Sequence, residues 1–173
     1  MKDNIPTSAK VVVIGGGIAG CSVAYHLTEF GWNDIVLLER DQLTSGTTWH
    51  AAGLLGQVGA SATITKLRNY SLNLYKKLQE ETGIETGLKQ NGSLTVATDT
   101  DRLEELKRQA TFAQRFNIQV DEINIDKITE LYPLINTKDI VGGIYIPKDG
   151  QADPIGITNV LAKAAKKKWR KIF

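Results

Sequence analysis

The residues best suited to chemistry lie in the first third of the chain. A glycine-rich stretch at residues 15–20, Gly-Gly-Gly-Ile-Ala-Gly, directly follows the apolar run at 11–14 and precedes a helical pattern that ends at Gly31. A buried parallel strand, a glycine turn and a helix in this order form the context that binds the pyrophosphate of a dinucleotide. The helix N-terminus would supply free N–H groups and the positive end of its dipole.

The glycines of this turn are expected to differ in role. Gly15 would allow the tight turn out of the strand, Gly17 the close approach of a phosphate, and Gly20 close packing of the helix on the sheet. Ile18 and Ala19 complete the predicted phosphate loop.

Glu39 ends a second apolar run, residues 35–38, and is followed by Arg40. A carboxylate at the end of this strand can accept hydrogen bonds from both ribose hydroxyls of an adenosine. The alternative is a glycine-rich turn beside a solvated glutamate. Glu39 and Arg40 together leave NAD and FAD both open as the dinucleotide.

The next segment, residues 44–54, favours FAD. Its small and polar residues surround one Trp and one His, so its backbone can run along an extended ligand. Hydroxyl groups here can donate to phosphate or ribityl oxygens, and Gly53 allows close approach to a flat ring. An NAD domain has no need for such a segment after the second strand. The candidate cofactor residues are Ser45, Gly46, Thr47, Thr48, Trp49, His50, Ala51, Ala52, Gly53 and Leu54.

Residues 48–54, Thr-Trp-His-Ala-Ala-Gly-Leu, resemble the amine-oxidising flavoproteins of the D-amino-acid oxidase superfamily, in particular the dimethylglycine and sarcosine dehydrogenase group. The resemblance implies that His50 is bonded covalently to the 8α carbon of the flavin, which would raise the flavin's potential. A histidine that only lines the pocket or bonds locally is the alternative. Further matching segments are 74–78, 80–83, 91–94, 142–145, 149–150 and 153–154.

The resemblance implies the reaction and its partners. An N-methyl amine would lose a hydride to the flavin, and the resulting imine would release formaldehyde or pass it to tetrahydrofolate. An electron-transfer flavoprotein is a candidate acceptor, and oxygen is another. No catalytic acid or base and no metal site can be assigned. Two alternatives stay open: a catalytically silent flavin-binding fragment or subunit completed by another chain, and an unrelated NAD-dependent enzyme.

The predicted fold is α/β, with a Rossmann-like FAD-binding domain built on a parallel sheet. We expect residues 1–84 to form part of this domain and residues 85–150 part of an inserted α+β substrate domain, a topology implied by the resemblance. Residues 151–173 would be a helix returning to the FAD domain. Because the motifs describe the front of a larger domain, the sequence also predicts a truncated chain.

Local patterns predict the remaining elements. Apolar spacing indicates helices at 61–82, 101–116 and 126–132, and Asp153 is expected to cap a helix that opens at Pro154. Asn91-Gly92 predicts a hairpin over residues 86–97. A strand is expected at 140–146.

Composition indicates a globular protein, with 42% hydrophobic and 23% charged residues. No apolar run is long enough to span a membrane. Residues 163–173 hold six of the 21 Lys and Arg residues; the other 15 face 19 Asp and Glu, a net charge of −4 that does not suit nucleic acid. The one cysteine, Cys21, is expected to pack in the first helix. We expect a cytoplasmic protein, or one of the mitochondrial matrix if it is eukaryotic.

Overall fold

The computed structural model describes residues 6–168, and by mutual contact the chain forms two units. The first unit comprises the chain up to residue 53, residues 73–88 and the chain from residue 152 onward. The second comprises residues 54–72 and 89–151. The last five residues of the predicted return helix, 169–173, lie outside the described part of the chain.

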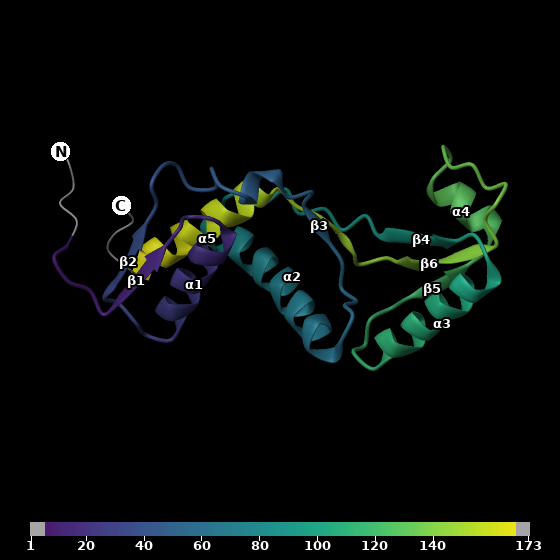
Figure 1. The fold of residues 1–173 in the computed structure, drawn as a ribbon, viewed down its shortest axis with the longest axis horizontal. Coiled ribbons are helices and arrows are strands. Elements are labelled where there is room, and N and C mark those ends of the chain that lie inside the picture. The colour runs from purple at the N-terminus through teal and green to yellow at the C-terminus, as the bar shows by residue number, and fades with distance from the viewer. Residues whose placement is uncertain (1–5, 169–173) are drawn as a thin grey trace. The chain divides into compact units, whose positions relative to one another are not determined.

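The first unit contains the predicted parallel strand pair and the helix between its strands (Figure 1). The two strands run in register, with Val11 opposite Ile35 and Ile14 opposite Leu38. The long C-terminal helix packs against the first helix. This arrangement confirms the α/β, Rossmann-like expectation for the start of the chain. The elements are β1 (Val11–Ile14), α1 (Ile18–Glu29), β2 (Ile35–Leu38) and α5 (Pro154–Lys168).

Strand β1 is less buried than its apolar sequence predicts. Val12 is 50% exposed and Ile14 is 85% exposed, whereas Ile35, Val36 and Leu37 of β2 are buried. The side chains of a strand alternate between two faces. Alternate residues of β1 face a surface that the described residues leave open, so an expectation of full burial was wrong for this strand.

The second unit is built on an antiparallel sheet in the order β4-β6-β5. Helix α3 covers this sheet, because its buried Leu106 packs with Ala97 and Ile144, and its Ala113 packs with Ile146. A further short pair joins β3 to β7. The elements are β3 (Leu54–Leu55), β4 (Ser93–Ala97), α3 (Thr100–Gln114), β5 (Asp121–Ile123), α4 (Ile125–Leu131), β6 (Gly142–Ile146) and β7 (Gly150–Gln151).

The hairpin predicted over residues 86–97 is wrong. Strand β4 pairs with β6, where Leu94 lies opposite Tyr145. On the other side of the Asn91–Gly92 turn, Lys89 pairs with Gln151. Both flanks of the turn therefore pair with residues 142–151 and not with each other.

The predicted helices agree closely with those observed. Helix α2 (Ala62–Thr82) ends at Gly83, whose φ of +67° suits a residue without a Cβ. Asp153 caps α5, and its two carboxylate oxygens accept from the backbone N–H groups of Ile155 and Gly156, both at 3.0 Å.

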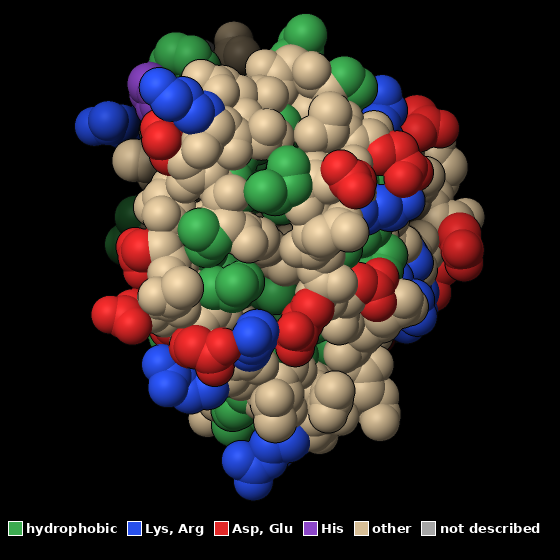
Figure 2. Space-filling model, turned by 90° about the vertical axis from the view of Figure 1, so that its right-hand side faces the viewer, with side chains coloured by type: hydrophobic (Ala, Val, Ile, Leu, Met, Phe, Trp, Pro, Cys, Tyr) green, Lys and Arg blue, Asp and Glu red, His purple; other side chains and the backbone are tan. Residues whose placement is uncertain are grey.

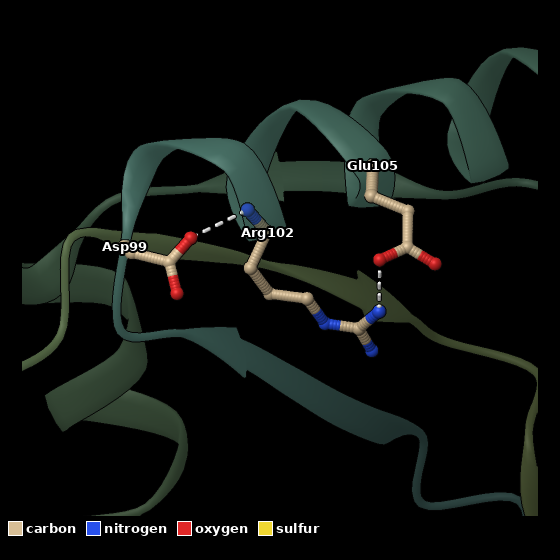
Figure 3. A network of polar contacts seen from close by, with 3 residues as sticks. All are labelled: Asp99, Arg102 and Glu105. Atoms are coloured by element: carbon tan, nitrogen blue, oxygen red, sulfur yellow. Dashed lines mark hydrogen bonds and ion pairs between the residues drawn. The ribbon is translucent and has the colours of Figure 1, made fainter.

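Helix α3 shows two kinds of polar contact near its N-terminus (Figure 3). The Asp99 carboxylate caps the helix by accepting from the backbone N–H of Arg102 at 2.8 Å. The Arg102 guanidinium in turn forms an ion pair with Glu105 at 2.5 Å, on the exposed side of the helix.

Part of the second unit's surface is apolar. Beyond α4, the side chains of Tyr132 and Leu134 are 52% and 85% exposed. Figure 2 looks onto the right-hand side of Figure 1, where green apolar side chains lie among red and blue charged ones. Among residues 6–168 no helix is both long enough and apolar enough to cross a membrane.

Candidate functional site

The glycine turn lies between the end of β1 and the start of α1. Gly15 has a φ of +105°, and its N–H donates to the carbonyl of Leu38 at 2.8 Å. A Cβ added at Gly20 would lie 1.9 Å from the Gly15 carbonyl oxygen, so only glycine lets the helix come this close to the turn. The predicted tight turn and close helix packing are both present in the backbone.

Helix α1 supplies no acidic or capping side chain to its own N-terminus. Gly17 is the N-cap and offers no side-chain cap, and the first turn holds no acidic residue. Ile18 and Ala19 form this first turn. Backbone N–H groups and the positive end of the helix dipole are therefore left for an anion or for a group from elsewhere in the chain.

Glu39 lies beside the glycine turn, as its place after β2 predicts. Its carboxylate accepts from the backbone N–H of Gly16 at 2.6 Å and from that of Asp41 at 3.2 Å. The bond from Gly16 is the main reason that the pKa of Glu39 falls below its usual value, and the Arg40 charge adds to the same shift. The carboxylate is thus held ionised at the carboxyl end of the sheet.

The polar segment that follows β2 returns to the glycine turn. The N–H of Thr44 donates to the Gly16 carbonyl at 3.1 Å, and Thr44 has a φ of +77°. Ser45, Gly46 and Thr47 are exposed. Thr44 is not among the candidate cofactor residues expected from the sequence. Nothing in the sequence indicates that a threonine will adopt the left-handed backbone conformation.

Thr48 lies directly against the start of α1. It is buried, and its hydroxyl oxygen accepts from the backbone N–H of Ile18 at 3.0 Å. A Cβ at Gly17 would lie 2.9 Å from this oxygen. The structure therefore brings the predicted phosphate loop and the predicted flavin segment into contact through one hydroxyl group.

His50 lies at the end of a short 3₁₀ turn, Thr48–His50. Its side chain is exposed, and its ring lies against that of Trp49, with the ring centres 3.8 Å apart and the planes tilted by 34°. Ala51 and Ala52 after it are also exposed. The imidazole is therefore accessible on the same unit as the glycine turn.

The last two candidate residues have other surroundings. Gly53 has a φ of +72°, its carbonyl accepts from the N–H of Ala152 at 2.9 Å, and a Cβ here would lie 2.2 Å from the Ala152 carbonyl oxygen. Leu54 belongs to β3 in the second unit and is 78% exposed. The neighbouring backbone thus requires glycine at position 53, apart from any contact with a flavin.

Cys21 is a buried residue of α1, as predicted. Burial is the main cause that raises the pKa of its thiol to about 11, with a contribution from the Glu39 charge. The thiol is therefore protonated at neutral pH and is no nucleophile. Among the described residues no group of His, Cys, Asp and Glu could hold a metal ion.

The second unit contains a cavity of about 840 Å³ that the sequence did not predict. Apolar groups from the sheet and from Phe112 line it, together with the charged side chains of Arg68 and Arg108. Asp149 also borders it and is only 4% exposed. The Asp149 carboxylate accepts from the backbone N–H of Gln57 at 2.7 Å and from the Ser93 hydroxyl at 2.6 Å.

A helix N-terminus with no capping side chain of its own, the glycine turn before it and an ionised carboxylate at the end of β2 fit a dinucleotide with an adenosine end. The sequence matches the family described as "FAD dependent oxidoreductase" over residues 10–173. The chain belongs to this family. The FAD named in the family's description fits the residues that surround the glycine turn.

Known relatives support the predicted resemblance. The chain is 43% identical to human "Sarcosine dehydrogenase, mitochondrial" over 162 residues, which are 93% of this chain and 18% of the relative. It is 42% identical over 169 residues to mouse "Pyruvate dehydrogenase phosphatase regulatory subunit, mitochondrial", covering 98% of this chain and 19% of that protein. The chain thus spans less than a fifth of the length of these relatives.

A solved structure shares the fold. L-proline dehydrogenase from P. horikoshii superposes with a TM-score of 0.89 and 28% sequence identity, over 98% of this chain and 44% of that protein. The predicted similarity to the sarcosine and dimethylglycine dehydrogenase group of FAD-dependent enzymes is confirmed.

Proposed function

We propose that this chain supplies the dinucleotide-binding part of an enzyme that oxidises N-methyl amines, with FAD bonded covalently through His50. The observation that carries the proposal is the placement of the exposed His50 turn against the N-terminus of α1. A ligand whose phosphates lie at that helix end can extend toward the imidazole. FAD is long enough to reach both the helix end and His50. For NAD, the turn that carries His50 would have no role.

Each part of the site would then have its own contact with the cofactor. Gly15, Gly17, Ile18, Ala19 and Gly20 would present the turn and first N–H groups of α1 to the pyrophosphate. Glu39, with Arg40 beside it, would accept the ribose hydroxyls.

The polar segment would hold the rest of the cofactor. Ser45, Gly46, Thr47 and Thr48 would contact phosphate or ribityl oxygens, and Trp49 would pack close to the ring system. The stretch from Ala51 through Ala52 and Gly53 to Leu54 would run along the flavin. The exposure of Ser45, Thr47 and Trp49 in the structure supports this assignment, because these side chains are available to a ligand.

Attachment would balance as follows. An imidazole N–H bond and one C–H bond of the flavin's 8α methyl group break, one C–N bond forms, and two protons go to solvent. The two electrons released pass to an external oxidant such as dioxygen. When bound, the flavin supplies the acceptance of a hydride from the N-methyl carbon. The residues of this chain hold and orient the cofactor.

The proposed substrate is supported by the relatives, and the proposed partners come from the family resemblance. We propose a small N-methyl amino acid such as sarcosine or dimethylglycine as substrate, since one relative is named for sarcosine. An electron-transfer flavoprotein and tetrahydrofolate are proposed partners of the whole protein. In a eukaryote, the mitochondrial matrix is the proposed location, and in a bacterium the cytoplasm. The proposed domains are 1–84 for FAD, 85–150 for part of the substrate domain and 151–173 for the return helix.

The decisive experiment is acid denaturation of the longest natural protein that contains these residues. We expect its flavin to remain attached, so that the protein band fluoresces on a denaturing gel, and we expect His50→Ala to release the flavin. His26→Ala is a matched control, because His26 lies within α1. Release of free flavin from the unmodified protein would contradict covalent attachment.

A second candidate function is a catalytically silent flavin binder or a subunit. It is favoured by the 42% identity to a protein named as a regulatory subunit of a phosphatase. Reduction of a dye by the protein, measured with sarcosine and with dimethylglycine, separates the two functions. A protein that holds FAD and does not reduce the dye with either amine would support the silent binder.

A further inference from the structure

We infer that Thr48 is a positioning residue whose hydroxyl ties the N-terminus of α1 to the turn that carries His50. The inference rests on the proposed function in one respect. If that function is right, the Thr48 side chain fixes the position of the attachment site relative to the phosphate site. The tie itself is a property of this chain without its cofactor.

The contact is a cap supplied from outside the helix. The N–H of Ile18 is the first of α1, and Gly17 before it has no side chain with which to cap it. The hydroxyl oxygen of Thr48 accepts from this N–H at 3.0 Å, across 30 residues of sequence. Thr48 is only 6% exposed, so water cannot readily take over the bond.

The space around the hydroxyl is fitted to it. A Cβ at Gly17 would lie 2.9 Å from the Thr48 oxygen, closer than real Cβ contacts allow. Glycine at this position thus serves an internal contact as well as the expected approach of a phosphate. The hydroxyl of residue 48 can therefore take this position only if residue 17 is glycine.

The turn depends on such a contact because it is short. It is held by hydrogen bonds from the N–H of His50 to the Thr47 carbonyl at 3.2 Å and from the N–H of Ala51 to the Thr48 carbonyl at 3.1 Å. A single 3₁₀ turn has weak hydrogen-bond geometry and little stability of its own. A buried bond from its first residue to a regular helix fixes where the turn begins, and with it the backbone of His50.

This role is compatible with a contact to the cofactor. A hydroxyl that accepts from one N–H keeps its own hydrogen to donate. Thr48 can accordingly cap Ile18 and donate to a phosphate oxygen at the same helix end. Binding of the phosphates would then strengthen the hold on the turn, through a network of hydrogen bonds that reinforce one another.

The first test uses the 173-residue chain without flavin. Thr48→Val keeps the side-chain volume and removes the hydroxyl, Thr48→Ser keeps the hydroxyl, and Thr28→Val is the matched control. Thr28 is a buried threonine of α1 whose hydroxyl donates to the Tyr25 carbonyl at 2.7 Å. Amide hydrogen exchange is measured by NMR at Ile18 and Ala51. We expect about fivefold faster exchange at both in Thr48→Val, from the loss of one hydrogen bond, and recovery in Thr48→Ser.

The second test uses the longest natural protein that contains these residues, saturated with FAD. We expect Thr48→Val to slow the appearance of acid-stable flavin about tenfold, a loss that Thr48→Ser restores and Thr28→Val does not share. Wild-type rates in Thr48→Val, or equal effects of the two valine variants, would overturn the positioning role. If the unmodified protein holds only dissociable flavin, covalent attachment fails as a function. In that case, amide hydrogen exchange at Ala51 is the test of the positioning role. Unchanged exchange in Thr48→Val would overturn that role.

Discussion

The two units of this protein use their acidic side chains in opposite ways. In the first unit, Glu39 lies at the surface of the glycine turn, where two backbone N–H groups hold its carboxylate ionised. In the second, Asp149 is only 4% exposed and links Gln57 to Ser93, two residues from separate parts of the chain. A carboxylate at a surface can serve a ligand, whereas a buried one that accepts a hydrogen bond at each oxygen chiefly holds segments together. The comparison predicts which changes affect the cofactor and which affect folding.

The largest effect is expected from Gly20→Ala in the first unit. The new Cβ would lie 1.9 Å from the Gly15 carbonyl oxygen, so the helix or the turn must move. We expect a loss of about 3 kcal/mol in the free energy of unfolding, together with loss of FAD binding. Urea denaturation and flavin titration measure the two effects. The control is Gly46→Ala, whose Cβ would meet nothing within 4 Å; equal stability of the two variants would contradict the packing argument.

Asp149→Asn tests the second unit in the same way. The amide keeps the shape of the side chain but removes the carboxylate from two hydrogen bonds. Its NH₂ group also faces one of the two donors, the Gln57 N–H or the Ser93 hydroxyl, and cannot accept from it. We expect the free energy of unfolding to fall by about 2 kcal/mol. FAD affinity is expected to stay within about twofold at temperatures where the variant is folded, because a change in stability is not a change in the cofactor contacts. Unchanged stability in urea would show that Asp149 is no internal link.

Glu39→Gln is expected to have the reverse pattern. Loss of a charge-assisted hydrogen bond to the ribose should weaken FAD binding about tenfold. At neutral pH the variant should lose less stability than Asp149→Asn, because the carboxylate that accepts from the Gly16 N–H is partly exposed. Fluorescence titration with FAD and with NAD provides the measurement. Undiminished FAD affinity, or tighter binding of NAD than of FAD, would remove Glu39 from the cofactor site.

The pH dependence of stability provides a finer comparison. Since the bond from Gly16 lowers the pKa of Glu39 in the folded chain below 4.5, its ionised form stabilises the fold fully above the unfolded-state value. That contribution is lost as the pH falls through the folded-state pKa. The difference in stability between the parent chain and Glu39→Gln should therefore be constant from pH 7 to about 5 and shrink in more acidic solution. A difference that changes between pH 7 and 6 would point to another group.

The smallest effects are expected on the exposed side of α3 (Figure 3). Asp99→Ala removes a helix cap and should cost about 1 kcal/mol. Glu105→Gln breaks an ion pair whose side chains are 41% and 52% exposed, and should cost less than about 0.5 kcal/mol. Urea denaturation of both variants at low and high salt gives the comparison. A larger loss for Glu105→Gln than for Asp99→Ala would show that the pair matters more than its exposure suggests.

Local patterns predicted most of the elements. Helices α2, α3 and α4 lie within two residues of their predicted bounds, and α5 opens at Pro154 as predicted, because apolar spacing, caps and breakers are all contained in a short stretch of sequence. The hairpin failed because the choice of strand partner is not local. Asn91-Gly92 does form a turn, with a φ of +82° at Gly92, yet β4 pairs with β6 about 50 residues away.

The candidate site likewise has residues that could be located from the sequence and contacts that only the structure shows. The glycine turn, the carboxylate after β2 and the histidine motif could be located from residue types, because a phosphate, a ribose and a flavin each require particular groups. The Thr44 and Thr48 contacts with the glycine turn could not, since they depend on how residues 44–48 return to α1. The cavity beside Asp149 gave no sequence signal either, because its walls come from segments scattered between residues 54 and 151.

By itself, the sequence determined most of the elements, the family and the residues that are proposed to face the cofactor. Their chemistry and spacing are fixed within short stretches such as residues 15–20 and 48–54. Tertiary structure decided the strand partners, the exposure of β1 and the bond from Ile18 to the Thr48 hydroxyl. The physical reason is distance along the chain: a contact across 30 or more residues depends on which segments pack together, and no short stretch of sequence contains that information.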